Sequence, residues 1–480
     1  MPVKRRTPDP DREPTTSVPA GALESFAATV RGAVLAPGDE AYEEARRVWN
    51  GMIDRRPAVI VRCSGVADVV AAVGFAREEG LSLAVRGGGH NVAGTAVCDD
   101  GLVVDLSAMT GVHVDPDAQT VRAEGGATLG DVDRETQLFG LATPLGVVSK
   151  TGIAGLTLNG GLGHLRRQFG LSCDNLVSAE VVTAAGEVLT ASAAEHPDLF
   201  WALQGGGGNF GVVTSFEFAC HEVGPEVSGL FVLHAADHAT EVFQLLREFA
   251  ADAPEEAAVI PFLGFVPELE AVPPEQWGDP MVAVLGCHLD PGDAGAAVLE
   301  PFREVGTPIA DLSGPMAYTD LQSMLDEDYP DGLNYYWKAT YLDDLDDELV
   351  DLLVERWRAS PSTLSTVDVW QLGGAIADRP QDASAFWHRD RSYLLTFEAN
   401  WEDPADTDAN VAWARESIDA VRRLAGAVGG YGNFPGFHED PSQTLFGDNL
   451  DRLVAVKTRY DPENLFRLNQ NVQPRTDASH

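Results

Sequence analysis

Residues Arg86-Gly87-Gly88-Gly89-His90-Asn91 decide the fold, and they directly follow the apolar run of residues 81–85. A strand that ends in three consecutive glycines presents bare backbone, so another group can approach it closely. The imidazole of His90 is then held beside that backbone, where it can act as a nucleophile or a ligand. The stretch indicates a cofactor cradle with a chemical tether. A surface glycine turn with an incidental histidine is the equally open alternative.

The charge of the chain is its most unusual bulk property. Its 480 residues carry a formal net charge of −41 at pH 7, and only four of its 33 lysine and arginine side chains are lysines. Self-repulsion on this scale destabilises a compact protein at low salt and is screened at high salt. We therefore predict a host with a salty cytoplasm, such as a halophilic microbe. The same negative field argues against nucleic acid and anionic membranes as partners.

Cysteine usage and the N-terminal residues indicate the compartment. The five cysteines are widely spaced and form no CxxC pair, which disfavours a disulfide framework or a zinc site and fits a reducing compartment. Residues 1–16 are charged and proline-rich without the apolar core of a signal peptide, and no apolar run of about 18 residues occurs. We expect a disordered segment over residues 1–20, no membrane span and a cytoplasmic location.

Hydrophobic periodicity predicts an α+β fold. A strand at residues 58–62, a helix at 66–79 and a strand at 81–85 form a β-α-β opening, and many short strands follow. After Cys220 the chain changes to longer acidic helices that alternate with strands, which places a domain boundary near residue 221. The remaining predicted strands are 102–105, 112–114, 120–123, 176–184, 188–191, 212–218, 282–287, 367–372 and 393–399, and the remaining predicted helices are 198–203, 239–250, 344–360 and 408–426.

Residues 206–211 match G-x-G-x-x-G, but their context rejects a Rossmann dinucleotide site. That site needs a strand before the glycines and a helix after them, whereas here a predicted helix precedes and a predicted strand follows. The glycines could still allow close approach of a pyrophosphate, or they could simply form a tight turn. No P-loop, G-x-S-x-G elbow or HExxH motif occurs, so the common hydrolase and kinase chemistries lack support.

Two histidine patterns are weak candidates for metal binding. His234 and His238 have an i, i+4 spacing on an expected helix start, but no third ligand stands nearby. His438-Glu439-Asp440 lies between prolines and indicates a surface loop. We expect no metal site.

Polar residues in two apolar neighbourhoods are candidates for a lined cavity. In the strand that starts at Tyr393, period two places Leu394, Thr396, Glu398 and Asn400 on one face, which either lines a cavity or faces solvent. The segment from Tyr431 to Asn471 is rich in amides. These groups are costly to bury without partners, so they either bind a polar heterocycle or cap loops.

Together these blocks resemble one family, the berberine-bridge-enzyme-like FAD-linked oxidoreductases of the vanillyl-alcohol-oxidase fold. The resemblance covers residues 57–474, and residues 198–214 fit the family's adenine-side loop, although Gln204 stands where arginine is expected. Three motifs carry it: residues 86–94; residues 151–163 with Arg167 and residues 170–175; and residues 431–434 with residues 460–466 and 469–471.

The resemblance implies a specific domain organisation. Residues 21–221 would form a PCMH-type FAD-binding domain of two α/β subdomains. Residues 222–430 would form a substrate-binding domain with an antiparallel sheet flanked by helices. Residues 431–475 would form a berberine-bridge-type segment that returns to the FAD-binding domain.

The resemblance also implies how FAD is held. His90 would carry the flavin covalently through its 8α-methyl group. Many relatives add a second link from a cysteine, but Val148 stands at that position and Cys173 does not correspond to it, so we expect a single link. The other FAD-binding residues that the resemblance implies are Arg86, Gly87, Gly88, Gly89, Asn91, Gly94, Gly152, Gly155, Gly160, Gly161, Gly163, Asn209, Val213, Asn433, Asn469 and Asn471.

The resemblance finally implies hydride transfer from a small substrate to the flavin, aided by a base with a tuned pKa. Tyr431 is the first candidate for the base, followed by Glu398 and Thr396, while Gln371 and Lys338 are candidates for substrate contact. We expect an oxidase that returns electrons to O₂ after oxidising an alcohol, sugar, amine or polyketide-like molecule. Three alternatives stay open: a dehydrogenase with another acceptor, a flavin-binding protein without turnover, and a structural or interaction protein.

Overall fold

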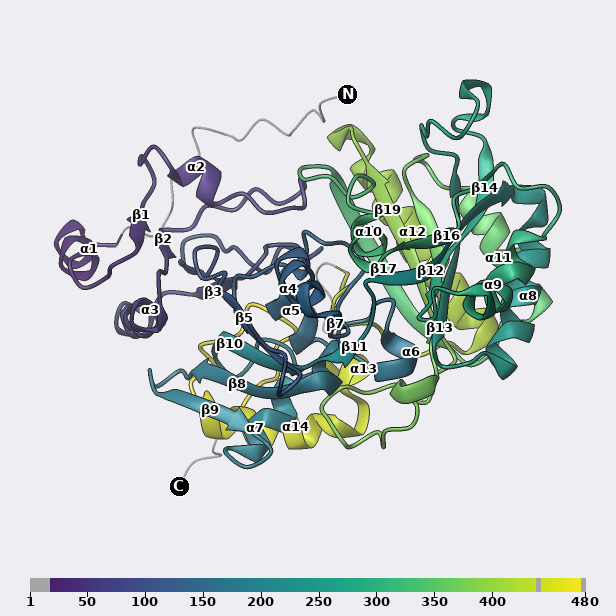
Figure 1. Cartoon of the computed structure of the whole chain (residues 1–480). Coiled ribbons are helices and arrows are strands. Elements are labelled where there is room, and N and C mark those ends of the chain that lie inside the picture. Colours follow the sequence, from purple (N-terminus) through teal and green to yellow (C-terminus); the bar gives the residue numbers. More distant parts are fainter. Residues whose placement is uncertain (1–17, 437–441, 476–480) are drawn as a thin grey trace.

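The computed structural model describes residues 18–436 and 442–475 of the chain. Of the disorder expected for residues 1–20, residues 1–17 fall outside this range, as does the loop expected at residues 438–440, while Ala20 is the first residue of a helix. Three main sheets organise the described residues, and Figure 1 shows the two smaller ones at the left and bottom and the largest at the right. Within the described residues, no helix combines the length and apolarity that a bilayer crossing requires.

The first sheet positions the glycine-rich stretch. Strand β2 (Val59–Arg62) leads through helix α3 (Val66–Glu78) to strand β3 (Leu83–Arg86), and both pair in parallel with β4 (Leu102–Asp105), while β1 (Ala33–Leu35) pairs antiparallel on the outside. The predicted β-α-β opening is therefore present. Because β3 ends at Arg86, the three glycines begin where the strand leaves the sheet. Helices α1 (Ala20–Ala27) and α2 (Tyr42–Ala45) precede β2.

The second sheet is antiparallel and carries the second glycine-rich region on its connections. The region from Gly152 to Gly170 forms α5 (Ile153–Leu158), bare loops and α6 (Arg166–Phe169). The buried side chains of the sheet pack against α4, α7 and α14 in one core. The strands, in sheet order, are β5 (Val112–Asp115), β6 (Thr120–Glu124), β10 (Val212–Ala219), β8 (Leu176–Val182) and β9 (Val188–Ser192), and the helices are α4 (Leu129–Thr136), α7 (Pro197–Leu203) and α14 (Leu450–Tyr460).

The third sheet is the largest, and its two faces have different partners. One face packs against four helices, three of which (α8, α9 and α11) lie on the outer right side in Figure 1. The other face packs against α10 and against the second glycine-rich region. The strands, in sheet order, are β15 (Ala310–Asp311), β12 (Glu226–Ala235), β14 (Pro280–His288), β13 (Ala257–Phe265), β18 (Thr366–Gln371), β19 (Tyr393–Trp401) and β17 (Asn334–Leu342), with β16 (Gly314–Ala317) beside β12; the helices are α8 (Ala239–Asp252), α9 (Asp293–Arg303), α10 (Tyr318–Ser323), α11 (Asp347–Arg358) and α12 (Thr407–Ala425).

The predicted α+β class with an antiparallel sheet flanked by helices is confirmed. Periodicity missed β12, β13 and β17, because these strands are buried on both faces and lack a regular alternation of apolar and polar residues. The helix start expected around His234 is wrong, since His234 lies in β12 and its Nε2 is 2.9 Å from the carbonyl oxygen of Phe302. Two short elements complete the fold: β7 (Leu141–Ala142) pairs with β11 (His221–Glu222), and α13 (Ser442–Phe446) precedes α14.

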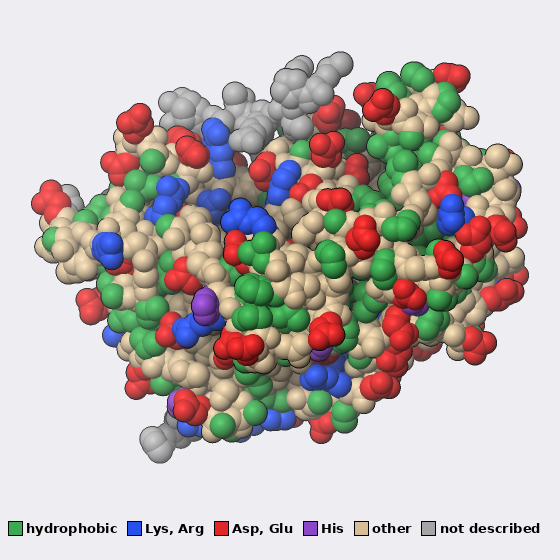
Figure 2. All heavy atoms as spheres, viewed as in Figure 1, with side chains coloured by type: hydrophobic (Ala, Val, Ile, Leu, Met, Phe, Trp, Pro, Cys, Tyr) green, Lys and Arg blue, Asp and Glu red, His purple; other side chains and the backbone are tan. Residues whose placement is uncertain are grey.

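On the face that Figure 2 shows, the acidic side chains that give the chain its net charge of −41 are not confined to one patch. Figure 2 shows Asp and Glu side chains distributed over the whole visible face, while Lys and Arg gather mainly toward the centre and left. A few carboxyls are nonetheless almost fully buried, among them those of Asp133 and Glu398.

Candidate active site

A large cavity of about 880 Å³ lies between the glycine-rich loops and the open face of the largest sheet. One wall comes from the loop after β3 and from the segment around α5, and the opposite wall comes from β13, β18, β19 and β17. The sequence-predicted residues that line it are Gly87, Gly88, Gly89, His90, Asn91, Val148, Gly152, Gly155, Val213, Glu398, Tyr431, Asn433 and Asn469.

Glycines build the cradle in two ways. A Cβ on Gly88 would collide with Gly152, and a Cβ on Gly152 would collide with Gly88, so these two glycines let the two loops touch. A Cβ added to Gly155 would meet nothing within 4 Å. The backbone of this residue is therefore exposed to the cavity. The loops therefore pack on each other through glycine and also offer exposed backbone to an occupant.

His90 is held at the edge of the cavity by an aromatic stack. Its ring lies 4.8 Å from that of Trp49 at an interplanar angle of 16°, and Trp49 stacks in turn on Tyr335 at 3.7 Å. Thr151 Oγ1 is 3.5 Å from Nδ1 of His90. Burial lowers the pKa of His90 to about 4, so the imidazole is neutral at pH 7 and keeps a nucleophilic nitrogen.

Two buried carboxyls, Glu398 and Asp368, line the cavity from the sheet side. Glu398 on β19 and Asp368 on β18 lie on the same face, because Glu398 pairs with Thr366 and Asp368 pairs with Thr396. Tyr329 Oη donates to Glu398 Oε2 at 2.9 Å, and Thr396 Oγ1 donates to Oε1 at 3.2 Å.

Burial raises the pKa of both Asp368 and Glu398, and the charge of Asp368 raises that of Glu398 further. Oδ1 of Asp368 is buried without a hydrogen-bond partner among the described residues. Since two adjacent buried carboxyls resist full ionisation, the pair can hold a proton near neutral pH.

Tyr431 lies beside the cradle with its hydroxyl group already accepting two hydrogen bonds. The backbone N–H of Leu162 donates to it at 3.0 Å, and Asn433 Nδ2 donates at 2.9 Å. Burial raises the pKa of Tyr431 to about 12. The phenol therefore keeps its proton at neutral pH and can donate it to an occupant of the cavity.

The motif residues Gly160, Gly161 and Gly163 do not line the cavity; they shape the loop that carries Leu162. Gly160 and Gly161 have φ values of +108° and +87°, which favour glycine, and a Cβ on Gly163 would collide with the carbonyl of Leu145. Two backbone hydrogen bonds hold this loop in place. Ser172 N donates to Gly161 O at 3.0 Å, and Cys173 N donates to Gly160 O at 2.9 Å.

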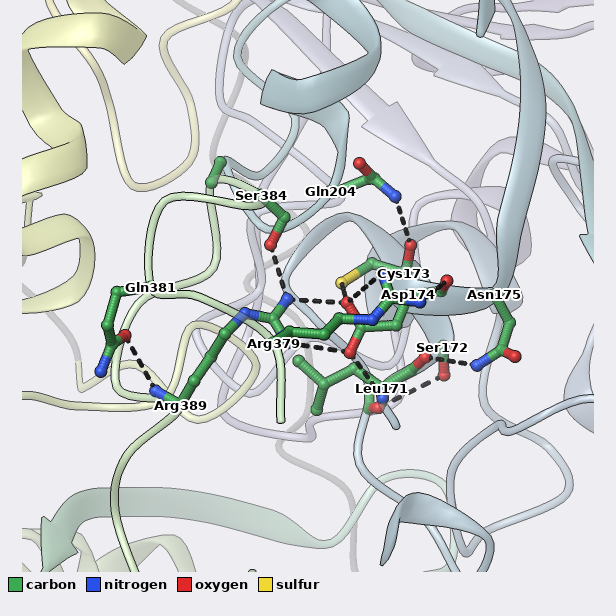
Figure 3. A network of polar contacts seen from close by, with 12 residues as sticks. Leu171, Ser172, Cys173, Asp174, Asn175, Gln204, Arg379, Gln381, Ser384 and Arg389 are labelled. Carbon is green, nitrogen blue, oxygen red and sulfur yellow. Dashed lines mark hydrogen bonds and ion pairs between the residues drawn. The ribbon is translucent and has the colours of Figure 1, made fainter. Parts of the chain in front are cut away.

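An ion-pair network holds the segment around Asp174 from the loop between β18 and β19 (Figure 3). Arg389 donates to both carboxylate oxygens of Asp174, at 2.9 and 2.7 Å, and both side chains are almost fully buried. Gln204, at the position where arginine is expected, donates to the carbonyl of Cys173 at 2.8 Å. The network therefore connects the loop at residues 379–389 to residues 172–174, whose backbone binds the glycine loop that carries Leu162.

Four other predicted FAD-binding residues also lie outside the cavity lining. Arg86 donates to the carbonyl of Ala45 at 2.6 Å, and a Cβ on Gly94 would press into Ile53. Asn209 binds the backbone of Gln470 and Val472, so it fastens the C-terminal segment, while Asn471 does not reach the cavity.

The substrate contacts expected for Gln371 and Lys338 do not fit the sheet geometry. Gln371 pairs with Tyr393, and Lys338 pairs with Phe397, whose side chains belong to the helix-covered face. Period two along each strand turns these residues away from the cavity. Thr396, which also does not line it, instead positions Glu398.

Among the lining residues that sequence reasoning did not select are Asp368, Tyr329, Trp49 and Trp337. The sequence does contain a signal for Asp368. With a period of two along the strand, Asp368 shares one face with Thr366 and Trp370, and all three line the cavity. Trp49 and Tyr329 lie outside regular elements, and Trp337 lies in a strand without polar alternation, so periodicity could not select them.

Among the described residues there is neither a metal site nor a cysteine in the cavity lining that could form a second covalent link to a cofactor. The described residues contain no group of three or more His, Cys, Asp or Glu side chains that could hold a metal ion. All five cysteines are buried and free, and none lines the cavity. Cys173 packs behind the cradle in an apolar cluster with Leu162.

Comparison with known proteins gives one consistent result. Family models match an FAD binding domain at residues 57–192 and a berberine and berberine-like segment at residues 430–473. An FAD-linked oxidoreductase of Dictyostelium discoideum is 32% identical over 459 residues, covering 94% of this chain and 97% of that protein. The (R)-6-hydroxynicotine oxidase of Paenarthrobacter nicotinovorans is 32% identical over 460 residues, covering 93% of this chain and 97% of that protein.

Solved structures share the fold over nearly the whole chain. A 6-hydroxy-D-nicotine oxidase from Arthrobacter nicotinovorans has a TM-score of 0.83 at 29% identity, covering 93% of this chain and 98% of that chain. A chitooligosaccharide oxidase has the same fold, with a TM-score of 0.82 at 23% identity, covering 95% of this chain and all of the other.

Proposed function

This chain belongs to the berberine-bridge-enzyme-like FAD-linked oxidoreductases, and we propose that it oxidises a small organic substrate with an FAD bonded covalently to His90. One observation carries the proposal. His90 on the glycine side and the Glu398–Asp368 pair on the sheet side line the same cavity. A tethered cofactor and a proton acceptor would then face one substrate.

The residues of the cavity fit a flavin. Bare backbone at Gly155 leaves room for a flat ring system, and the neutral imidazole of His90 suits attack on the flavin's methyl group. Oδ1 of Asn469 is buried and has no hydrogen-bond partner among the described residues, so it offers an acceptor to a polar edge. When bound there, FAD supplies the acceptor for a hydride from the substrate.

The proton acceptor we propose is the Glu398–Asp368 pair rather than Tyr431. A phenol with a pKa of about 12 is a poor base at neutral pH, whereas a carboxyl pair with raised pKa values is suited to this range. Tyr431 would donate a hydrogen bond and orient the occupant, and Thr396 would hold the Glu398 carboxylate in position.

We further propose a single covalent link and reoxidation by O₂. Val148 lines the cavity where many relatives carry the second linking cysteine. The similar proteins named above include oxidases, which supports O₂ as the acceptor over another electron carrier. The net charge of −41, with acidic side chains distributed over the face shown in Figure 2, supports function in a salty cytoplasm.

Anaerobic titration tests the function. The purified protein should be yellow, and an organic substrate should bleach it without air and yield hydrogen peroxide when air is admitted. Bleaching without peroxide would point to a dehydrogenase. A colourless protein that cannot be loaded with FAD would contradict the proposal.

A further inference from the structure

Five acidic side chains line the cavity, and two of them, Asp368 and Glu398, hold a proton between them near neutral pH, so the lining is negative without being fully ionised. The five are Glu268, Glu327, Asp328, Asp368 and Glu398, and no lysine or arginine lines the cavity within the described part of the chain. The basic ring there, His90, is neutral at pH 7. A bound FAD would add its own pyrophosphate anion. Such a site repels anionic substrates and attracts cations.

Adaptation of the surface to salt does not account for this pattern. Adaptation of that kind places carboxyls in water, whereas Asp368 is 7% exposed and Glu398 is 2% exposed. Oδ1 of Asp368 is buried without a hydrogen-bond partner in the described structure and belongs to the cavity lining. A buried acceptor of this kind is costly unless an occupant supplies a donor.

Aromatic rings surround the carboxyl pair. Trp337 lies directly opposite Glu398 in the register of β17 and β19. The rings of Trp49, Tyr329 and Phe434 meet Trp337 edge-on, with centroid separations of 5.5, 5.5 and 5.0 Å. Aromatic faces combined with buried carboxyls suit an organic cation.

We propose that the substrate is an apolar or aromatic amine, which enters as its ammonium cation and is oxidised at the carbon beside nitrogen. This inference rests on the proposed function and names its substrate class. The N–H proton passes to the ionised carboxyl of the Glu398–Asp368 pair, which leaves a neutral amine. The adjacent C–H bond then breaks and its electron pair leaves with the hydrogen as hydride to the flavin. The nitrogen lone pair forms the C=N bond of an iminium product.

Three probes of one shape test the substrate class on the holoenzyme. Benzylamine is a cation at pH 7, benzyl alcohol is neutral and benzoate is an anion. Equilibrium dialysis measures their affinities independently of turnover. We expect benzylamine to bind at least about tenfold more tightly than benzyl alcohol, with benzoate the weakest.

Variants then test whether the preference for the amine over the alcohol depends on Asp368 and Glu398. In the double variant Asp368→Asn with Glu398→Gln, the amine-to-alcohol ratio of affinities should fall about tenfold, with Asp368→Asn alone as a second variant. Asp237→Asn, whose side chain is 94% exposed, is the matched control and should keep the ratio. Equal binding of alcohol and amine, no saturable binding of benzylamine, or an unchanged ratio in the double variant would overturn the proposal.

These outcomes separate the substrate class from the function. A yellow protein that is bleached by alcohols or sugars but shows no preference for the amine keeps the oxidoreductase function and refutes the amine. A protein that never takes up flavin refutes the proposed function, whatever the binding ratio.

Discussion

Tyr329 contacts both Glu398 and the residue that supports His90. Its hydroxyl group donates to Glu398 Oε2 at 2.9 Å, and its backbone carbonyl accepts a hydrogen bond of 3.0 Å from the indole of Trp49, which stacks on His90. A single residue between α10 and β17 therefore connects the carboxyl side of the cavity with the histidine side.

Replacing Tyr329 with phenylalanine should move the pH dependence of substrate oxidation. The hydrogen bond from Tyr329 favours the ionised form of Glu398, so its loss raises the pKa of that carboxyl. The acid limb of the rate of flavin reduction should shift upward by about one pH unit, as measured by anaerobic stopped flow. Tyr335→Phe is the control, because the hydroxyl of Tyr335 donates to the carbonyl of Pro330 instead. An acid limb that stays in place would remove Glu398 as the titrating base.

The buried Asp133 should make stability fall with rising pH. Burial raises the pKa of Asp133 from 3.8 to about 7, so between these values the folded state holds a proton that the unfolded state has lost. Between pH 5 and pH 8 the free energy of unfolding of Asp133→Asn should therefore gain about 3 kcal/mol relative to wild type. Urea unfolding at the two pH values measures the change. The exposed Asp117→Asn should show none, and a pH-independent difference for Asp133→Asn would contradict the account.

The two ion pairs made by Arg389 and Arg391 should contribute very differently to the free energy of unfolding. Arg389→Met leaves the buried Asp174 carboxylate without its main partner and should lower the free energy of unfolding by about 3–5 kcal/mol. Arg391→Met breaks a pair with Asp343, whose side chain is 69% exposed, and should cost less than about 1 kcal/mol. Chemical denaturation of both variants in the same salt measures the contrast, and equal costs would refute the anchoring role of Asp174.

Much of the site follows from local patterns in the sequence. The apolar run before Gly87 predicts a strand that ends at bare backbone, and alternation along β19 places Glu398 on a face that proves to be buried and cavity-lining. The same rule, applied to β18, selects Asp368 and excludes Gln371. Tyr329 could not be found in this way, because its position depends on how a loop between two elements folds back across the sheet. The roles of Gly160 and Asn209 were similarly hidden, since both act on backbone that is distant in sequence.

Salt should stabilise the protein. Screening reduces the self-repulsion of a net charge of −41, so the urea midpoint should rise between low salt and molar KCl. An equal or lower midpoint in KCl would count against a salty working environment.

The most direct test of the account is the mass of the peptide that contains His90, measured after denaturation and proteolysis. We predict that this peptide carries the added mass of one flavin, that Cys173→Ala keeps it and that His90→Ala loses it. An unmodified His90 peptide from yellow protein, or a flavin attached to another residue, would contradict the covalent cradle on which the account depends.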